Sequence, residues 1–273
     1  MKRHRISASA FALLGGVLVS SAQSPHYSVT DLGIVGASTT IAPVQPFGIT
    51  NQGLIAGGAM AGANEHAVVW YLGQILDLGT LSGGSNSNGL AVNQNGQVVG
   101  MSETGTADPN HEDFCGFQGA GLATQGGACL PFSWKNGVMR SLPTLGGVNG
   151  IAIGTNAIGD AAGWAENTIT EPACPGTQIL QFKPAIWRNG AIEELPTLSG
   201  DDFGAAYFIT DNGIIVGSSG SCGTFNGNAF ANFQPLHAIV WGGTVKPWIS
   251  ATWAGPDKEW ETWRLPPIIW GKW

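Results

Sequence analysis

Four copies of one short pattern occur along the chain, and this repetition limits the fold more than any other feature. Each copy reads as a strand, a tight turn and a second strand. The copies run from Ile49 to Gly57, from Val92 to Gly100, from Thr155 to Gly163 and from Ile209 to Gly217. Asn95-Gly96 and Asn212-Gly213 are dipeptides typical of a type I′ turn, whose two central residues need positive φ. The pattern predicts four β-hairpins.

A second pattern that ends in tryptophan follows each hairpin. Its copies are His66–Trp70, Leu130–Trp134, Lys183–Trp187 and His237–Trp241. A turn glycine follows the first three tryptophans closely (Gly73, Gly137 and Gly190), and two leucines follow each glycine. This pattern also reads as strand, turn, strand. Each unit therefore predicts a four-stranded antiparallel meander.

Such a sheet exposes two apolar faces, so neighbouring units must stack to bury them. Four-stranded units that recur at this spacing are typical of propeller blades. We expect an all-β, repeat-built β-propeller of about four four-stranded blades. Residues 27–33 resemble the last strand of a unit, since Asp31-Leu32-Gly33 repeats Asp77-Leu78-Gly79. Because the pattern decays after Trp241, we expect this N-terminal strand to pair with the strand that ends there and to close the last blade.

The segments "HAVVW…DLGTLSGG" and "HAIVW" resemble the HAF repeat of predicted bacterial extracellular proteins. The resemblance covers roughly residues 27–241. The third motif position, which is phenylalanine in that family, is Val68 and Ile239 here, and two units lack the His-Ala pair. The resemblance implies a secreted repeat protein and assigns no chemistry.

The chain begins as a secretory signal peptide does, with basic residues Lys2 to Arg5, an apolar stretch from Ala8 to Val19 and small residues before Gln23. We expect residues 1–22 to be removed, residues 23–249 to form the repeat array, and residues 250–273 to form a divergent tail. Five tryptophans in this tail indicate either an aromatic patch or a chain end that has lost the repeat. No further segment is apolar over the length that a membrane span needs. The mature protein is thus expected outside the cell, in the periplasm or on the cell surface.

The four cysteines, Cys115, Cys129, Cys174 and Cys222, all fall between the second and third strands of their units. An even number in an exported protein predicts two disulfides. The favoured pairs are Cys115–Cys129 and Cys174–Cys222.

Two groups of residues are candidate metal ligands. His66 and His237 occupy one position in two units, where they either meet at a metal or bind backbone within their own blades. Asp108 and Asp113 flank the most polar segment, which either holds an ion or is a solvated loop.

No catalytic or cofactor motif is present, so we expect no catalytic residue and no cofactor. The net charge of −7 disfavours nucleic acid as a partner. The expected function is therefore a binding or scaffold module for an extracellular ligand, a glycan or a protein. The alternative is a propeller hydrolase or lyase that acts on extracellular polysaccharide. Polar side chains that meet at the centre of the blades would favour the enzyme, and an apolar centre the scaffold.

Overall fold

The computed structural model describes residues 27–33, 35, 45–171, 178–221, 237–242 and, as backbone, 245–252. The expected signal peptide and most of the tryptophan-rich tail lie outside these residues. The chain divides into two compact units, residues 1–31 and 32–273, and the account below concerns the second. In the first unit, residues 27–31 have no regular secondary structure.

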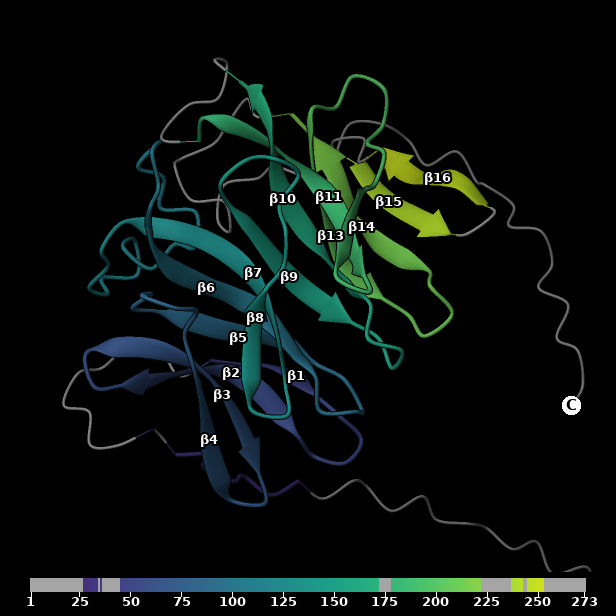
Figure 1. The fold of residues 1–273 in the computed structure, drawn as a ribbon. Coiled ribbons are helices and arrows are strands. Elements are labelled where there is room, and N and C mark those ends of the chain that lie inside the picture. Colours follow the sequence, from purple (N-terminus) through teal and green to yellow (C-terminus); the bar gives the residue numbers. More distant parts are fainter. Residues whose placement is uncertain are drawn as a thin grey trace, which may run out of the picture. The chain divides into compact units, whose positions relative to one another are not determined.

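The described residues form sixteen strands in four antiparallel sheets, each with its strands in chain order (Figure 1). The first sheet contains β1 (Gln45–Ile49), β2 (Ile55–Ala61), β3 (Asn64–Tyr71) and β4 (Gln74–Gly79). The second contains β5 (Ser87–Val92), β6 (Val98–Ala107), β7 (Gly127–Lys135) and β8 (Val138–Ser141). The third contains β9 (Gly150–Thr155), β10 (Ala161–Thr170), β11 (Leu180–Arg188) and β12 (Ala191–Glu194). The fourth contains β13 (Phe203–Ile209), β14 (Ile215–Gly220), β15 (His237–Gly242) and β16 (Val245–Thr252).

The all-β class and the four meanders are confirmed. Within the described residues there is no helix that is long and apolar enough to cross a membrane.

The type I′ geometry occurs in the second hairpin of a unit, where the first hairpin was expected to have it. Asn136-Gly137 and Asn189-Gly190 have positive φ at both residues. In the first hairpin of the second unit only Gly96 has positive φ. The loop there is longer than a two-residue turn, and Asn93 closes it with hydrogen bonds. The Asn93 carbonyl accepts from Gly96 N, and its side-chain Oδ1 accepts from Asn95 N. The assignment of type I′ to Asn95-Gly96 is therefore wrong.

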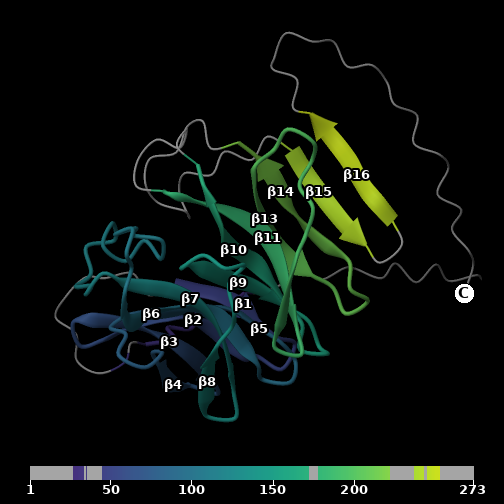
Figure 2. The same cartoon turned by 45° about the horizontal axis from the view of Figure 1, so that its top comes forward.

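Consecutive sheets pack through the leucines at or just after the end of each fourth strand. Leu78 and Leu81 lie in one buried cluster with residues of the first and second sheets, and Leu195 lies between the third and fourth. Two of the repeat tryptophans bind these linkers. Trp187 Nε1 donates to the Pro143 carbonyl and Trp241 Nε1 to the Pro196 carbonyl, both at 2.8 Å. The first strands β1, β5, β9 and β13 contact one another in succession. Figure 2 shows these four strands close together in the middle of the four sheets.

The prediction that residues 27–33 complete the last blade is wrong. The free edge of β15 pairs with β16, in a register that matches Ile239 to Ile249 and Gly242 to Val245. The chain after Trp241 therefore supplies its own fourth strand, although its sequence no longer resembles the repeat. Residues 27–33 form no strand.

The second sheet carries the longest described connection, residues 108–126 between β6 and β7. Cys115 in this insertion is bonded to Cys129 of β7, with an S–S distance of 2.01 Å, which confirms the first predicted disulfide. Cys174 and Cys222, the second predicted pair, lie outside the described residues. Phe114 and Phe117 beside the bond are buried in a cluster with Met101.

We expect the Cys115→Ser, Cys129→Ser double variant to lose about 3 kcal/mol of unfolding free energy, because the bond closes a loop of 14 residues in the unfolded chain. Urea unfolding followed by circular dichroism measures the loss. Reduced wild-type protein should unfold at the same midpoint as the double variant. Equal midpoints for oxidised protein and variant would show that the bond does not stabilise the fold.

Candidate functional site

Two asparagines join neighbouring sheets at equivalent positions. Asn86 precedes β5, and its Oδ1 accepts from Glu65 N of the first sheet at 3.0 Å. Asn149 precedes β9, and its Oδ1 accepts from Cys129 N of the second sheet at 2.9 Å. Both asparagines are fully buried. Each one therefore satisfies a buried backbone donor that no strand partner reaches.

The same asparagines hold a buried glutamate each. Asn86 Nδ2 donates to Glu103 at 2.9 Å, and Asn149 Nδ2 donates to Glu166 at 3.1 Å. The two glutamates occupy one position in the second strand of their sheets, and both are at most 5% exposed. The repeat thus places an Asn–Glu pair at the same end of the second and third sheets.

The insertion brings two more carboxylates to Asn149. Asp108 and Glu112 lie 2.9 and 3.1 Å from its Nδ2, so three carboxyl groups surround one amide. Asp108 and Glu166 are fully buried, and Glu112 is 6% exposed. An amide nitrogen carries two hydrogens, so it cannot donate to all three carboxyl groups at once.

A retained proton resolves this conflict. Burial, and then the negative charge of Glu112, raise the pKa of Glu166 to about 9. Burial also raises the pKa of Glu112, while the bond from Ile179 N to its Oε1, at 2.6 Å, opposes that rise. Glu166 is therefore a neutral carboxylic acid at pH 7. Gln178 Nε2 donates to its other oxygen at 2.8 Å.

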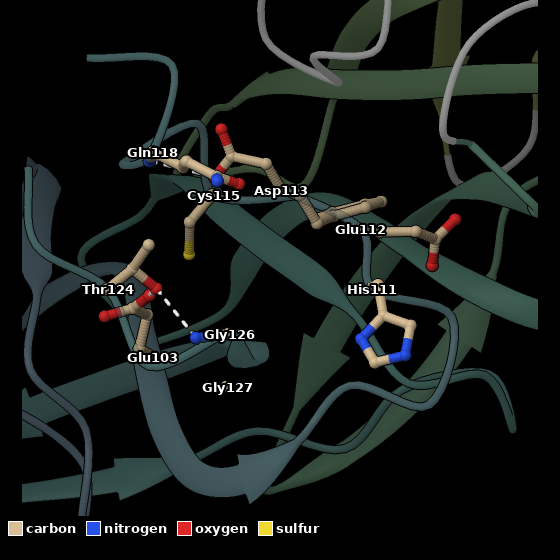
Figure 3. A pocket seen from close by; sticks show the side chains of 10 residues that line it. Glu103, His111, Glu112, Asp113, Cys115, Gln118, Thr124, Gly126 and Gly127 are labelled. Atoms are coloured by element: carbon tan, nitrogen blue, oxygen red, sulfur yellow. Dashed lines mark hydrogen bonds between the residues drawn. The ribbon is translucent and has the colours of Figure 1, made fainter. Parts of the chain in front are cut away.

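A cavity of about 240 Å³ lies beside this network, between the insertion and the ends of β6 and β7. Its lining residues are Glu103, His111, Glu112, Asp113, Phe114, Cys115, Gln118, Thr124, Gly126 and Gly127. Figure 3 shows His111 and Glu112 on one side of the pocket and Glu103 and Thr124 on the other. None of these described lining residues is a lysine or an arginine. The pocket therefore presents hydrogen-bond acceptors and an imidazole.

His111 has a strained backbone in this pocket. Its φ is 57°, a conformation that histidine adopts more often than most non-glycine residues. His111 N donates to the Asp108 carbonyl, and Asn110 N donates to Asp108 Oδ1 at 2.8 Å. Asp108 thus turns the chain so that the exposed His111 side chain faces the pocket while Glu112 turns inward.

The two aspartates predicted as ion ligands have different hydrogen-bond partners. Asp108 binds Asn149, whereas the Asp113 carboxylate accepts from the backbone of Gln118 and Gly119 at 3.1 and 2.7 Å. The expectation of a solvated loop is wrong for Asp108 and Glu112, which are buried. Among the described residues, no three His, Cys, Asp or Glu side chains are arranged to hold a metal ion.

The two histidines predicted as a pair have separate partners. His66 Nδ1 lies 3.0 Å from the Asp77 carboxylate of β4, and His237 Nδ1 lies 2.8 Å from Asp201. Each histidine thus pairs with a carboxylate, where binding to backbone or to a shared metal was expected.

Asp201 also accepts from Ser219, which brings a serine, an aspartate and a histidine together. In a nucleophilic triad the imidazole lies between the hydroxyl and the carboxylate. Here the carboxylate lies between the other two. Ser219 is fully buried and accepts from Leu198 N, just as its repeat equivalent Ser102 accepts from Leu81 N. Ser219 is therefore a structural residue of the repeat.

Sequence reasoning missed Asn86, Asn149, Glu103, Glu166 and Gln178. The asparagines had a signal, since Gly84-Ser85-Asn86 and Gly147-Val148-Asn149 both follow a Thr-Leu linker. Gln178 had none, because it reaches the site from the β10–β11 connection. The chain matches no protein-family model and no curated protein.

Proposed function

We propose that this protein is a secreted or cell-surface binding module whose four sheets are blades of a propeller-type scaffold. Its ligand occupies the pocket over the second sheet. One observation carries the proposal. The pocket is built from an insertion that the repeat does not need, and that insertion is held by a disulfide and by Asp108. Loops placed on a rigid scaffold are where binding residues concentrate.

The pocket chemistry favours a neutral polyhydroxylated ligand, a glycan. Carboxylates at Glu103, Glu112 and Asp113 accept hydrogen bonds from hydroxyl groups and repel anions. The volume of about 240 Å³ is below the about 300–1,000 Å³ of a pocket that encloses a whole small molecule. It therefore suits one end or one unit of a larger chain.

The enzyme alternative has one observation in its favour, a neutral Glu166 next to Glu112. Glycosidases use a protonated and an ionised carboxyl group on opposite sides of the scissile bond. Here, however, Glu166 is fully buried and bound to Asn149 and Gln178. It has no path to a polymer. In addition, Leu90, Ile151 and Ala205 of the first strands lie in one apolar cluster, which supports a scaffold.

A glycan array beside a hydrolase and lyase panel tests the proposal on the mature protein. We expect binding without turnover. His111→Asn keeps a residue that tolerates positive φ and removes the imidazole, so it should weaken binding by about 10- to 100-fold. The His66→Ala, His237→Ala variant is the matched control and should bind as wild type does. Turnover, or binding that His111→Asn leaves unchanged, would contradict the proposal.

A further inference from the structure

Equivalent positions form each of the three interfaces between consecutive sheets. The residue before the glycine of the second strand faces the following sheet, and it is Ala56, Val99 and Ala162 in the first three sheets. All three are fully buried. We call this side of a sheet its next-sheet face, and the opposite side its preceding-sheet face.

The fourth sheet leaves its next-sheet face open. Val216 occupies the same position as those three residues and is 38% exposed. Its cross-strand partner Phe208 is 68% exposed. Two large apolar side chains thus lie side by side on a face that every other sheet buries.

The first sheet leaves its preceding-sheet face partly open. Ile49 is 71% exposed, whereas Ile209 at the same position of the fourth sheet is 8% exposed. Leu32 and Val35 pack on this face as Leu78 and Leu81 pack on the second sheet. Leu32 and Val35 therefore form the linker part of a further sheet-to-sheet interface. No sheet among the described residues packs on the other side of this linker.

We propose that a second copy of this chain fills both gaps, head to tail, with its first sheet against the fourth sheet of its partner. The two open faces occupy the positions of the two halves of the internal interface, and apart from Phe208 their residues correspond to those of that interface. Within one chain the described strands of the first and fourth sheets share no broad contact. If the propeller-type architecture holds, two copies give a closed ring of eight sheets, a size that propellers adopt.

Phe208 distinguishes this interface from the internal ones. Its equivalents are Gly48, Ala91 and Gly154, because the first strands of neighbouring sheets approach closely. A Cβ on Gly154 would lie 2.8 Å from the Tyr207 carbonyl oxygen. The phenylalanine ring requires wider spacing and fills the wider gap with apolar surface. Phe208 is thus the residue on which the contact depends.

Analytical ultracentrifugation of the mature protein tests the pairing. Wild type should be a dimer, and Phe208→Asp and Ile49→Asp should each raise the dimer dissociation constant about 100-fold or more. An equimolar mixture of the two variants should associate again, because each retains the face that the other has lost. Ile158→Asp is the matched control, since Ile158 is 74% exposed in a turn of the third sheet, and it should dimerise as wild type does.

Three outcomes would overturn the proposal. A monomeric wild type would mean that the chain covers its own faces or leaves them open. A dimer that survives Ile49→Asp but is lost in Phe208→Asp would mean that two fourth sheets pack on each other. Variants that fail to reassociate on mixing would exclude the head-to-tail arrangement. If the aspartate variants misfold by circular dichroism, Phe208→Ser and Ile49→Ser replace them. Glycan binding by a monomer would leave the proposed function intact.

Discussion

Asn149→Ala should lower the free energy of unfolding by about 4 kcal/mol. Truncation leaves the buried Cys129 N without an acceptor and removes the amide between Asp108, Glu112 and Glu166. A buried backbone donor left unpaired costs about 1–3 kcal/mol, and buried charges that lose a partner add about as much again. Urea unfolding at pH 7, followed by near-UV circular dichroism, measures the sum.

Asn86→Ala is the matched control for this prediction. Asn86 makes the same inter-sheet bond, to Glu65 N, and the same bond to a glutamate, Glu103. In place of Asp108 and Glu112 it has one neutral acceptor, the Ala123 carbonyl, 2.7 Å from its Nδ2. The two variants should differ by about 2 kcal/mol, which isolates the cost of the carboxyl cluster. Equal losses would mean that the cluster contributes nothing beyond the repeat contact.

The repeat made the fold predictable to the level of the sheet. Glycines at fixed intervals and tryptophans at strand ends predict meanders. A hairpin needs turn-forming residues between its two strands. A strand with one buried face needs apolar residues at every second position. The last strand was missed for a related reason. β16 contains Pro247 and Trp248 and none of the repeat residues, so only its pairing with β15 identifies it.

The candidate site was predictable only in part. The segment from Asp108 to Asp113 stands out as polar, but composition does not show which side chains point inward. Asp108 and Glu112 are buried because Asn149, far along the chain, offers them a donor. Such a contact depends on how two sheets stack. The disulfide was easier to predict, since Cys115 and Cys129 are close in sequence within one unit.

Stability should also fall as the pH rises, and Glu166 should account for the upper part of the change. The pKa of Glu166 is about 9 in the folded protein and returns to about 4.5 on unfolding. Between these values the native state binds more protons than the unfolded state, so the free energy of unfolding decreases with pH. Burial raises the pKa of Glu65 to about 7, which adds to the slope below pH 7 only. We expect a loss of several kcal/mol between pH 5 and pH 9, most of it from Glu166.

Two glutamine variants separate these contributions. A glutamine at position 166 keeps a donor toward Glu112 and an acceptor for Asn149 and cannot ionise. Glu166→Gln should therefore flatten the curve between pH 7 and pH 9 and make the protein more stable than wild type at pH 9. Glu65→Gln should flatten only the range from pH 5 to pH 7, because the proton of Glu65 is already lost above it. Melting temperatures across this pH range give both curves. If Glu166→Gln follows the wild-type slope above pH 7, the carboxyl group at position 166 is ionised in the folded protein, and its neighbour Glu112 carries the proton instead.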